Sequence, residues 1–177
     1  MSPSLTTYRY PLNTSYEFPY TAPIAILPII TGADSPILRQ KTKKVAKVTK
    51  EILKLIQDME VTTKKADGLG LAAPQVGESL RVCIVRLNGK FLPLINPEIF
   101  WKSTEIEVAE EGCLSLPNFW MNVPRSVSIA VRYQNAKGEE QERKLKDLEA
   151  RIVQHEVDHL DGILITDYAD TVPHQAL

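Results

Sequence analysis

Two histidines spaced four residues apart, His155 and His159, restrict the fold more than any other feature of this sequence. On an α-helix each residue advances by about 100°, so both imidazoles lie on one face, one turn apart, and can bind the same ion. Glu156 directly follows the first histidine, where its carboxylate can accept a proton from a bound water. The H-E-x-x-H pattern therefore predicts a helix with two metal ligands and a base. Two histidines on a partly buried helix face are an equally good interpretation of the pattern alone.

A hydrolytic metal site needs a third protein ligand, and the residues downstream do not supply one. The extended pattern H-E-x-x-H-x-x-G-x-x-H has Ile165 at its last position, and residues 160–177 contain no glutamate. His174 is present, but it lies in a tail with a proline and is interpreted as solvent-exposed. The third ligand is therefore expected upstream of the helix.

Cys113 is the best upstream candidate, because it lies among acidic residues, glycine and proline rather than within an apolar run. Cys83, in contrast, lies in the strand-like run 81–87 and is interpreted as core packing. A thiolate with two neutral imidazoles leaves charge on the ion and suits Zn²⁺ or Fe²⁺. The alternative is a nucleophilic Cys113 paired with one of the histidines, which leaves their four-residue spacing unexplained.

A third segment, GLGLAAPQVG at residues 68–77, combines glycines with alternating apolar residues. Such a backbone can be approached closely, which suits an extended peptide that adds itself as a strand. The segment lacks the third glycine of a phosphate-binding loop. The amide of Gln75 can donate to an oxyanion, although a turn-capping amide explains this residue equally well.

Hydrophobic periodicity predicts an α+β fold, in which antiparallel sheets pack around the central H-E-x-x-H helix. Apolar residues three or four apart within 45–59 predict an N-terminal helix, with Gly68 just beyond its end. The second helix is expected to end at Gly162, the usual position of a glycine after a helix. Strand-like runs lie between the helices, at 81–87, 91–97, 105–117, 127–134 and 140–148.

The length of 177 residues and the charge balance indicate one globular domain, spanning residues 23–177, after an irregular arm at 1–22 rich in Pro, Ser, Thr and Tyr. A formal net charge of -1 gives no reason to expect nucleic acid or an anionic membrane as a partner. No apolar run is long enough to span a membrane, and no secretory signal is apparent. Two unpaired cysteines favour a reducing compartment, and we expect the cytoplasm, although the sequence does not distinguish it from an organelle.

Together the three segments resemble the peptide deformylase family. Its motifs G-φ-G-φ-A-A-x-Q, E-G-C-L-S and H-E-x-D-H are matched in order at residues 68–75, 111–115 and 155–159, and the likeness extends over about residues 23–168. The resemblance implies a hydrolase that removes the formyl group from the N-terminal formylmethionine of newly made polypeptides and releases formate. It also implies one divalent ion, usually Fe²⁺ and replaceable by Zn²⁺ or Ni²⁺, held by Cys113, His155 and His159.

The resemblance further assigns roles around the ion. Glu156 would carry the proton of the attacking water, and the amide of Gln75 with the backbone N–H of Leu114 would stabilise the oxyanion. Gly68, Leu69 and Gly70 would hold the peptide backbone, and Arg151 would form part of the wall of the methionine pocket. Glu111 and Arg125 would make a structural ion pair.

Three departures from the family pattern bear on this expectation. Arg151 stands where an apolar wall is usual, so either its head reaches solvent while its stem lines the pocket, or the specificity is altered. Trp120 stands where many members have an arginine that contacts the peptide. The chain ends too early for the long C-terminal helix that docks on the ribosome, so only transient proximity is expected. The alternative function is an altered homologue that binds peptides as a metal-stabilised module; the oligomeric state stays open.

Overall fold

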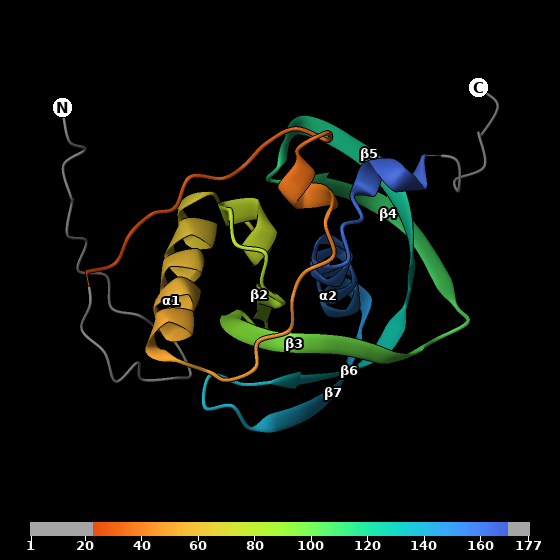
Figure 1. Ribbon diagram of the computed structural model, residues 1–177. Coiled ribbons are helices and arrows are strands. Elements are labelled where there is room, and N and C mark those ends of the chain that lie inside the picture. Colours follow the sequence, from red (N-terminus) through yellow and green to blue (C-terminus); the bar gives the residue numbers. More distant parts are fainter. Residues whose placement is uncertain (1–22, 170–177) are drawn as a thin grey trace.

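The computed structural model describes residues 23–169 and has an α+β architecture, as predicted (Figure 1). A five-stranded antiparallel sheet has the order β1-β2-β3-β6-β7, and β4 pairs with β5 in a separate two-stranded sheet. The helices and strands, with η for 3-10 helices, are η1 (Pro36–Arg39), α1 (Lys50–Lys65), β1 (Gly70–Ala72), η2 (Ala73–Val76), β2 (Val82–Leu87), β3 (Lys90–Lys102), β4 (Ile106–Cys113), β5 (Leu116–Ser126), β6 (Ser128–Gln134), β7 (Glu140–Lys146), α2 (Asp147–Leu160) and η3 (Ile165–Tyr168).

Helix α2 occupies the centre of the molecule, seen nearly end-on in Figure 1 between β2 and the β4–β5 hairpin. Both faces of β2 are buried, which explains why apolar residues follow one another in this strand instead of alternating with polar ones. Cys83 and Val85 belong to the core cluster shared with α2, whereas Val82 and Ile84 belong to the cluster shared with α1. The structure thus confirms that Cys83 is a core residue, and both cysteines are free.

Helix α1 buries the predicted apolar face, with Ile56 and Met59 fully inside. The side chain of Thr49 caps its start by accepting from the Ile52 N–H at 3.5 Å. The helix ends at Lys65, and the left-handed residue that follows is Asp67, with φ 54°, rather than a glycine. Gly68 therefore has a different role from the predicted stop.

The predicted strand 105–117 is wrong in its extent. It breaks at a two-residue turn, so that β4 ends at Cys113 and β5 begins at Leu116. β5 then continues to Ser126 and pairs back along β4, although no strand was predicted between 118 and 126. The reason is local, because two prolines and Asn118, at φ 62°, interrupt the alternation that signals a strand.

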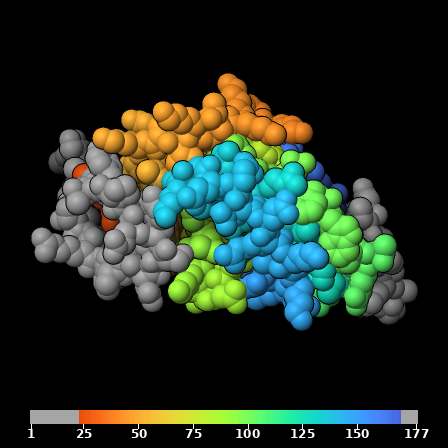
Figure 2. Space-filling model, turned by 90° about the horizontal axis from the view of Figure 1, so that it is seen from below, coloured from red at the N-terminus to blue at the C-terminus, as the bar shows by residue number. Residues whose placement is uncertain are grey.

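The first described residues cross α1 and are held by it. The Ala25 N–H donates to Asp58 Oδ1 at 2.9 Å, and the Leu27 N–H donates to Thr62 Oγ1 at 2.8 Å. Viewed from below in Figure 2, the β6–β7 hairpin occupies the middle of the surface, and the orange segment before α1 lies along the upper edge. The expected arm at 1–22 and His174 lie outside the described residues.

Within residues 23–169, no helix combines the length and apolar character needed to cross a membrane.

Candidate metal centre and peptide cleft

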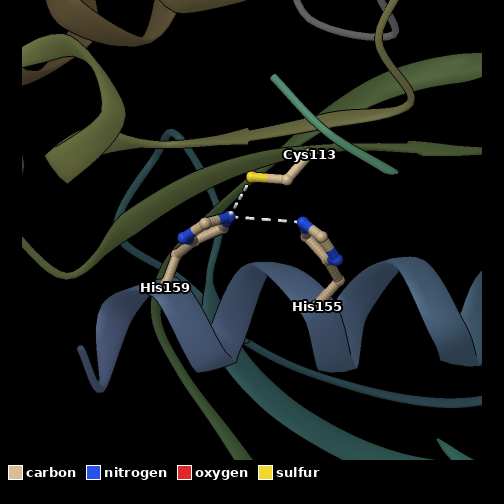
Figure 3. Close-up of side chains that lie close together, drawn as sticks. All are labelled: Cys113, His155 and His159. Atoms are coloured by element: carbon tan, nitrogen blue, oxygen red, sulfur yellow. Dashed lines mark hydrogen bonds between the residues drawn. The ribbon is translucent and has the colours of Figure 1, made fainter. Parts of the chain in front are cut away.

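Cys113, His155 and His159 converge as the sequence predicted (Figure 3). The cysteine is the last residue of β4, and the histidines project from one face of α2. His159 Nε2 lies 3.2 Å from Cys113 Sγ and 3.2 Å from His155 Nε2. Ligands bound to one tetrahedral ion at ~2.0–2.3 Å are separated by roughly 3.3–3.6 Å. Both of these distances are close to that range, and all three ligand atoms lie within 4.8 Å of one another.

The buried carboxylate of Glu111 orients His155. Its Oε2 lies 2.9 Å from His155 Nδ1, which leaves Nε2 to face the other two ligands. Arg125 binds the same carboxylate through two hydrogen bonds of 3.0 Å, so the predicted ion pair is present. Burial opposes ionisation of Glu111, but the hydrogen bonds from His155 and Arg125 outweigh it and lower its pKa to about 2.

The guanidinium of Arg151 does not reach solvent, contrary to one of the two expectations. Its side chain is 8% exposed, and Nη1 donates to Glu111 Oε1 at 2.8 Å and to the Val123 carbonyl at 2.9 Å. Nη2 donates to the Glu107 carbonyl at 2.8 Å and lies 3.2 Å from its carboxylate. The positive charge is therefore paired with hydrogen-bond acceptors of the β4–β5 hairpin. Arg151 also lines the cavity.

Glu156 lies beside the ligands with one unused acceptor. Its Oε2 is buried and has no hydrogen-bond partner among the described residues, and the same holds for Nδ1 of His159. Burial is the main cause that raises the pKa of Glu156 to about 7. An orphaned carboxylate oxygen beside three converging ligands fits a bound cation that carries water, so the residues present fit a divalent ion.

The two histidines differ in protonation when no ion is bound. Burial opposes the charged form of both, but hydrogen bonds with Cys113 and Glu111 raise the pKa of His155 to about 10. Burial and the neighbouring His155 charge lower the pKa of His159 well below its ordinary value. Binding of an ion requires neutral imidazoles, so it competes with protonation of His155.

Gln75 is held with its amide nitrogen toward the centre. Its Oε1 accepts from the Ala72 N–H at 2.8 Å, and its Nε2 lies 3.1 Å from Ser115 Oγ and 3.7 Å from Cys113 Sγ. Its carbonyl accepts from the Ile30 N–H at 2.8 Å, so the segment that crosses α1 also fixes this residue. The amide is thus both a turn cap and a donor directed at the site, the two interpretations that the sequence left open.

The two glycines of the first motif make room for the site itself. A Cβ on Gly70 would lie 2.3 Å from Glu156 Oε1, and a Cβ on Gly68 would lie 2.9 Å from a methyl carbon of Leu114. Real Cβ atoms essentially never come so close, so a methyl group at Gly70 would displace the Glu156 carboxylate, whereas the end of the flexible Leu114 side chain can move away from a methyl group at Gly68. The packing of Glu156 therefore requires glycine at position 70, a reason that the sequence alone did not reveal.

The site opens into a cavity of about 460 Å³. Every predicted site residue except His159 and Arg125 lines it. Phe119, Trp120 and Leu148 are exposed apolar residues at the cavity. The resemblance had marked only the position of Trp120 as a peptide contact, and the one signal for Phe119 and Leu148 was their apolar character in polar surroundings. The indole of Trp120 packs over Gly112, where a Cβ would lie 2.7 Å from the ring.

Comparisons with known proteins agree with this geometry. The family model for polypeptide deformylase matches residues 26–174. A peptide deformylase from Pseudothermotoga lettingae is 50% identical over 132 residues, which cover 75% of this chain and 77% of the relative. A peptide deformylase from Dictyoglomus thermophilum is 48% identical over 140 residues, which cover 79% of this chain and 91% of the relative.

Solved structures show the same fold. The crystal structure of peptide deformylase from Thermotoga maritima is 44% identical with a TM-score of 0.78, and the match covers 80% of this chain and 96% of that one. A Met-Ala-Ser-bound class I type b peptide deformylase from Acinetobacter baumannii is 35% identical with a TM-score of 0.77, and the match covers 81% and 98% of the two chains. On sequence, fold and metal centre, this chain belongs to the peptide deformylase family.

Proposed function

We propose that this metal-dependent peptide deformylase removes the formyl group from formylmethionine at the start of nascent polypeptides, with Glu156 as the proton carrier. The observation that carries the proposal is the orphaned Oε2 of Glu156, a buried acceptor beside the three converging ligand atoms. A carboxyl with a pKa near 7 can both accept and return a proton at neutral pH. A purely structural metal site has no use for such a group.

Cys113, His155 and His159 would hold one divalent ion, which we propose to be Fe²⁺, with Zn²⁺ and Ni²⁺ able to replace it. A bound ion supplies a Lewis acid that polarises the formyl oxygen and acidifies water. Three protein ligands leave a fourth position free for the reaction, as catalytic sites require. One soft thiolate and two imidazoles suit these metals better than Mg²⁺ or Ca²⁺.

The proton path needs only the residues around the ion. Glu156 accepts the proton of the water that attacks the formyl carbon, and returns it to the amine nitrogen of methionine as the C–N bond breaks. Formate and a free amino terminus result. The Nε2 group of Gln75 and the backbone N–H of Leu114 donate to the formyl oxygen as it gains negative charge. Gln75 suits this role because the Ala72 N–H holds its amide in one orientation.

The peptide backbone would bind along β1, next to Gly68, Leu69 and Gly70. β1 is an edge strand of the five-stranded sheet formed by residues 23–169, paired with β2 alone. An extended peptide can therefore add itself as a further strand and place its amino terminus near the metal centre. The relative bound to Met-Ala-Ser supports a short methionine peptide as the ligand.

A second candidate is a peptide-binding module in which the ion only stabilises the fold. The exposed apolar residues at the cavity favour peptide binding in either case. However, neither Glu156 nor Gln75 is a ligand, and a structural site normally fills the fourth position with another Cys or His. A hydrolase accounts for Glu156, for Gln75 and for the exposed apolar residues at the cavity.

The test is formate release from formyl-Met-Ala-Ser by protein kept anaerobic with Fe²⁺, compared with the acetylated peptide. We expect rapid release of formate and no release of acetate at a comparable rate. Glu156→Gln should keep its metal and lose at least about 100-fold in kcat, because it removes the base and leaves the ligands. Glu78→Gln, at an exposed position away from the cavity, is the matched control. Near-normal rates in Glu156→Gln would refute the proton path, and binding of both peptides without hydrolysis would favour the module.

A further inference from the structure

Arg151 joins the two halves of the metal centre. It lies one turn before His155 on α2, and its acceptors all belong to the hairpin that carries Cys113. Those acceptors are the Glu111 carboxylate, the Glu107 carbonyl and carboxylate on β4, and the Val123 carbonyl on β5. One guanidinium therefore ties the helix that supplies two ligands to the strand that supplies the third.

The contact with Glu111 reaches His155 directly. Glu111 Oε1 accepts from Arg151 Nη1 at 2.8 Å and from Arg125 Nε at 3.0 Å, while Oε2 accepts from Arg125 and binds His155 Nδ1. Each carboxylate oxygen thus has two partners, and the carboxylate cannot rotate without breaking a buried charged hydrogen bond. The remaining nitrogen of Arg125, Nη1, donates to Asp158 and the Tyr168 hydroxyl, so Arg151 supplies the further donor to Oε1.

The same geometry directs the head of Arg151 into the β4–β5 hairpin. Both terminal nitrogens are engaged in the hairpin, yet the residue lines the cavity together with Leu148 and Ile152. A buried guanidinium with paired carboxylates is not an exposed positive charge, and its three methylenes are apolar. The cavity wall at this position is therefore compatible with an apolar methionine side chain.

We propose that the guanidinium of Arg151 is a positioning group for His155, acting through Glu111, and that the methylenes of the same side chain form part of the methionine pocket. The first half concerns metal retention and holds whatever the substrate is. The second half rests on the proposed function. The two roles can be tested separately. A side chain that keeps the methylenes but lacks the guanidinium should lose the positioning role and keep the pocket role.

Arg151→Met keeps an apolar stem of similar length and removes the head. We expect it to release Zn²⁺ to a chelator about 10–100-fold faster than the parent protein, the usual effect of losing a residue that orients a metal ligand. The visible spectrum of the Co²⁺-substituted protein should also change, because it reports the ligand geometry. KM for formyl-Met-Ala-Ser should stay within about twofold. Arg151→Ala removes head and stem, so it should release metal equally fast and raise KM at least about fivefold, as expected when buried methylenes are lost.

Two further variants make the result interpretable. Arg132→Met removes an exposed arginine that pairs with Glu142 on the sheet, and should change neither metal release nor KM. Arg151→Lys keeps the charge with fewer donors, so it should fold even if Arg151→Met does not, and should release metal at a rate between those of parent and Met variant.

Parent-like metal release and an unchanged Co²⁺ spectrum in folded Arg151→Met, or in Arg151→Lys if only that variant folds, would overturn the positioning role. An increase of KM in Arg151→Met as large as in Arg151→Ala would overturn the pocket role. Metal release is measured without any peptide, so failure of the proposed deformylation would leave the first half intact.

Discussion

At the scale of single residues, Gly70 shows how an absent side chain serves the site. Its Cα faces the carboxylate of Glu156 so closely that a methyl group would lie 2.3 Å from Oε1 and 2.7 Å from the carboxylate carbon. The glycine in β1 therefore sets the position of the carboxylate on α2, two elements that are distant in the sequence. Glycine is needed at position 70 because of this contact and not because of the backbone conformation, since φ of Gly70 is not positive.

We predict that Gly70→Ala displaces Glu156 and lowers kcat about 100-fold, since a misplacement of about 1 Å at a reacting group has effects of that size. Formate release and metal content should be measured together, and the metal content should not fall. Gly89→Ala is the control, because a methyl group there meets nothing within 4 Å although the backbone is left-handed. It should cost stability and leave kcat unchanged. Equal kcat values for the two variants would contradict the steric argument.

A second prediction at this scale concerns acid stability and Glu111. Its pKa is lowered from 4.5 to about 2 in the folded, metal-free protein. The resulting stabilisation, up to about 3 kcal/mol, is fully present above pH ~4.5 and is lost as the pH falls toward 2. The difference in free energy of unfolding between the parent and Glu111→Gln should therefore shrink with acidification. Denaturant titrations of metal-free protein between pH 3 and 7 measure it, with exposed Glu142→Gln as control; a difference that does not change with pH would rule the explanation out.

At the scale of elements, the end of α2 matters because the helix carries both histidines. Gly162 follows the helix at φ 77°, and a Cβ there would also lie 2.8 Å from the backbone carbonyl of Arg39. A second contact holds the same end, since the Thr42 N–H and hydroxyl both donate to the Leu160 carbonyl. The glycine thus satisfies a turn and a close approach at once.

We predict that Gly162→Ala destabilises the protein by more than about 2 kcal/mol, because it adds a clash with backbone to a left-handed conformation. Gly138→Ala is a matched control, with φ 79° and only an ordinary contact of 3.6 Å with Val48. It should cost about 1 kcal/mol. Unfolding in urea measures both values, and equal losses would show that the clash with Arg39 is relieved without cost.

At the scale of the whole molecule, an ion held by Cys113, His155 and His159 would connect α2 to the β4–β5 hairpin, so its binding should stabilise the entire fold. An ion present at about 1,000 times its Kd adds roughly 4 kcal/mol, which raises Tm on the order of 10 °C for a chain of this size. A chelator should remove this increment from the parent protein. Cys113→Ala should show no metal-dependent shift.

The control for this experiment is Cys83→Ala, which removes the other free cysteine from the core between β2 and α2. It should lower Tm with and without metal by similar amounts and keep the metal-dependent shift. A large shift that persists in Cys113→Ala would place the ion elsewhere.

Local patterns determined much of this protein. A period of 3.6 residues predicted α1 and α2, the four-residue spacing of the histidines indicated one helix face, and the lack of downstream ligands indicated Cys113 as the third ligand. These predictions succeeded because each depends on residues within one element, or on the chemistry of the ion.

Only the tertiary structure decided the rest. The extent of β5, the packing of Gly70 against Glu156 and the direction of the Arg151 head depend on how α2 packs against β1 and the β4–β5 hairpin. The sequence left open whether the Arg151 head reaches solvent or the specificity is altered, and the structure shows the head buried against the β4–β5 hairpin. The physical reason is that contacts between elements follow from strand register and helix packing. The periodicity within one element does not specify which other elements it contacts.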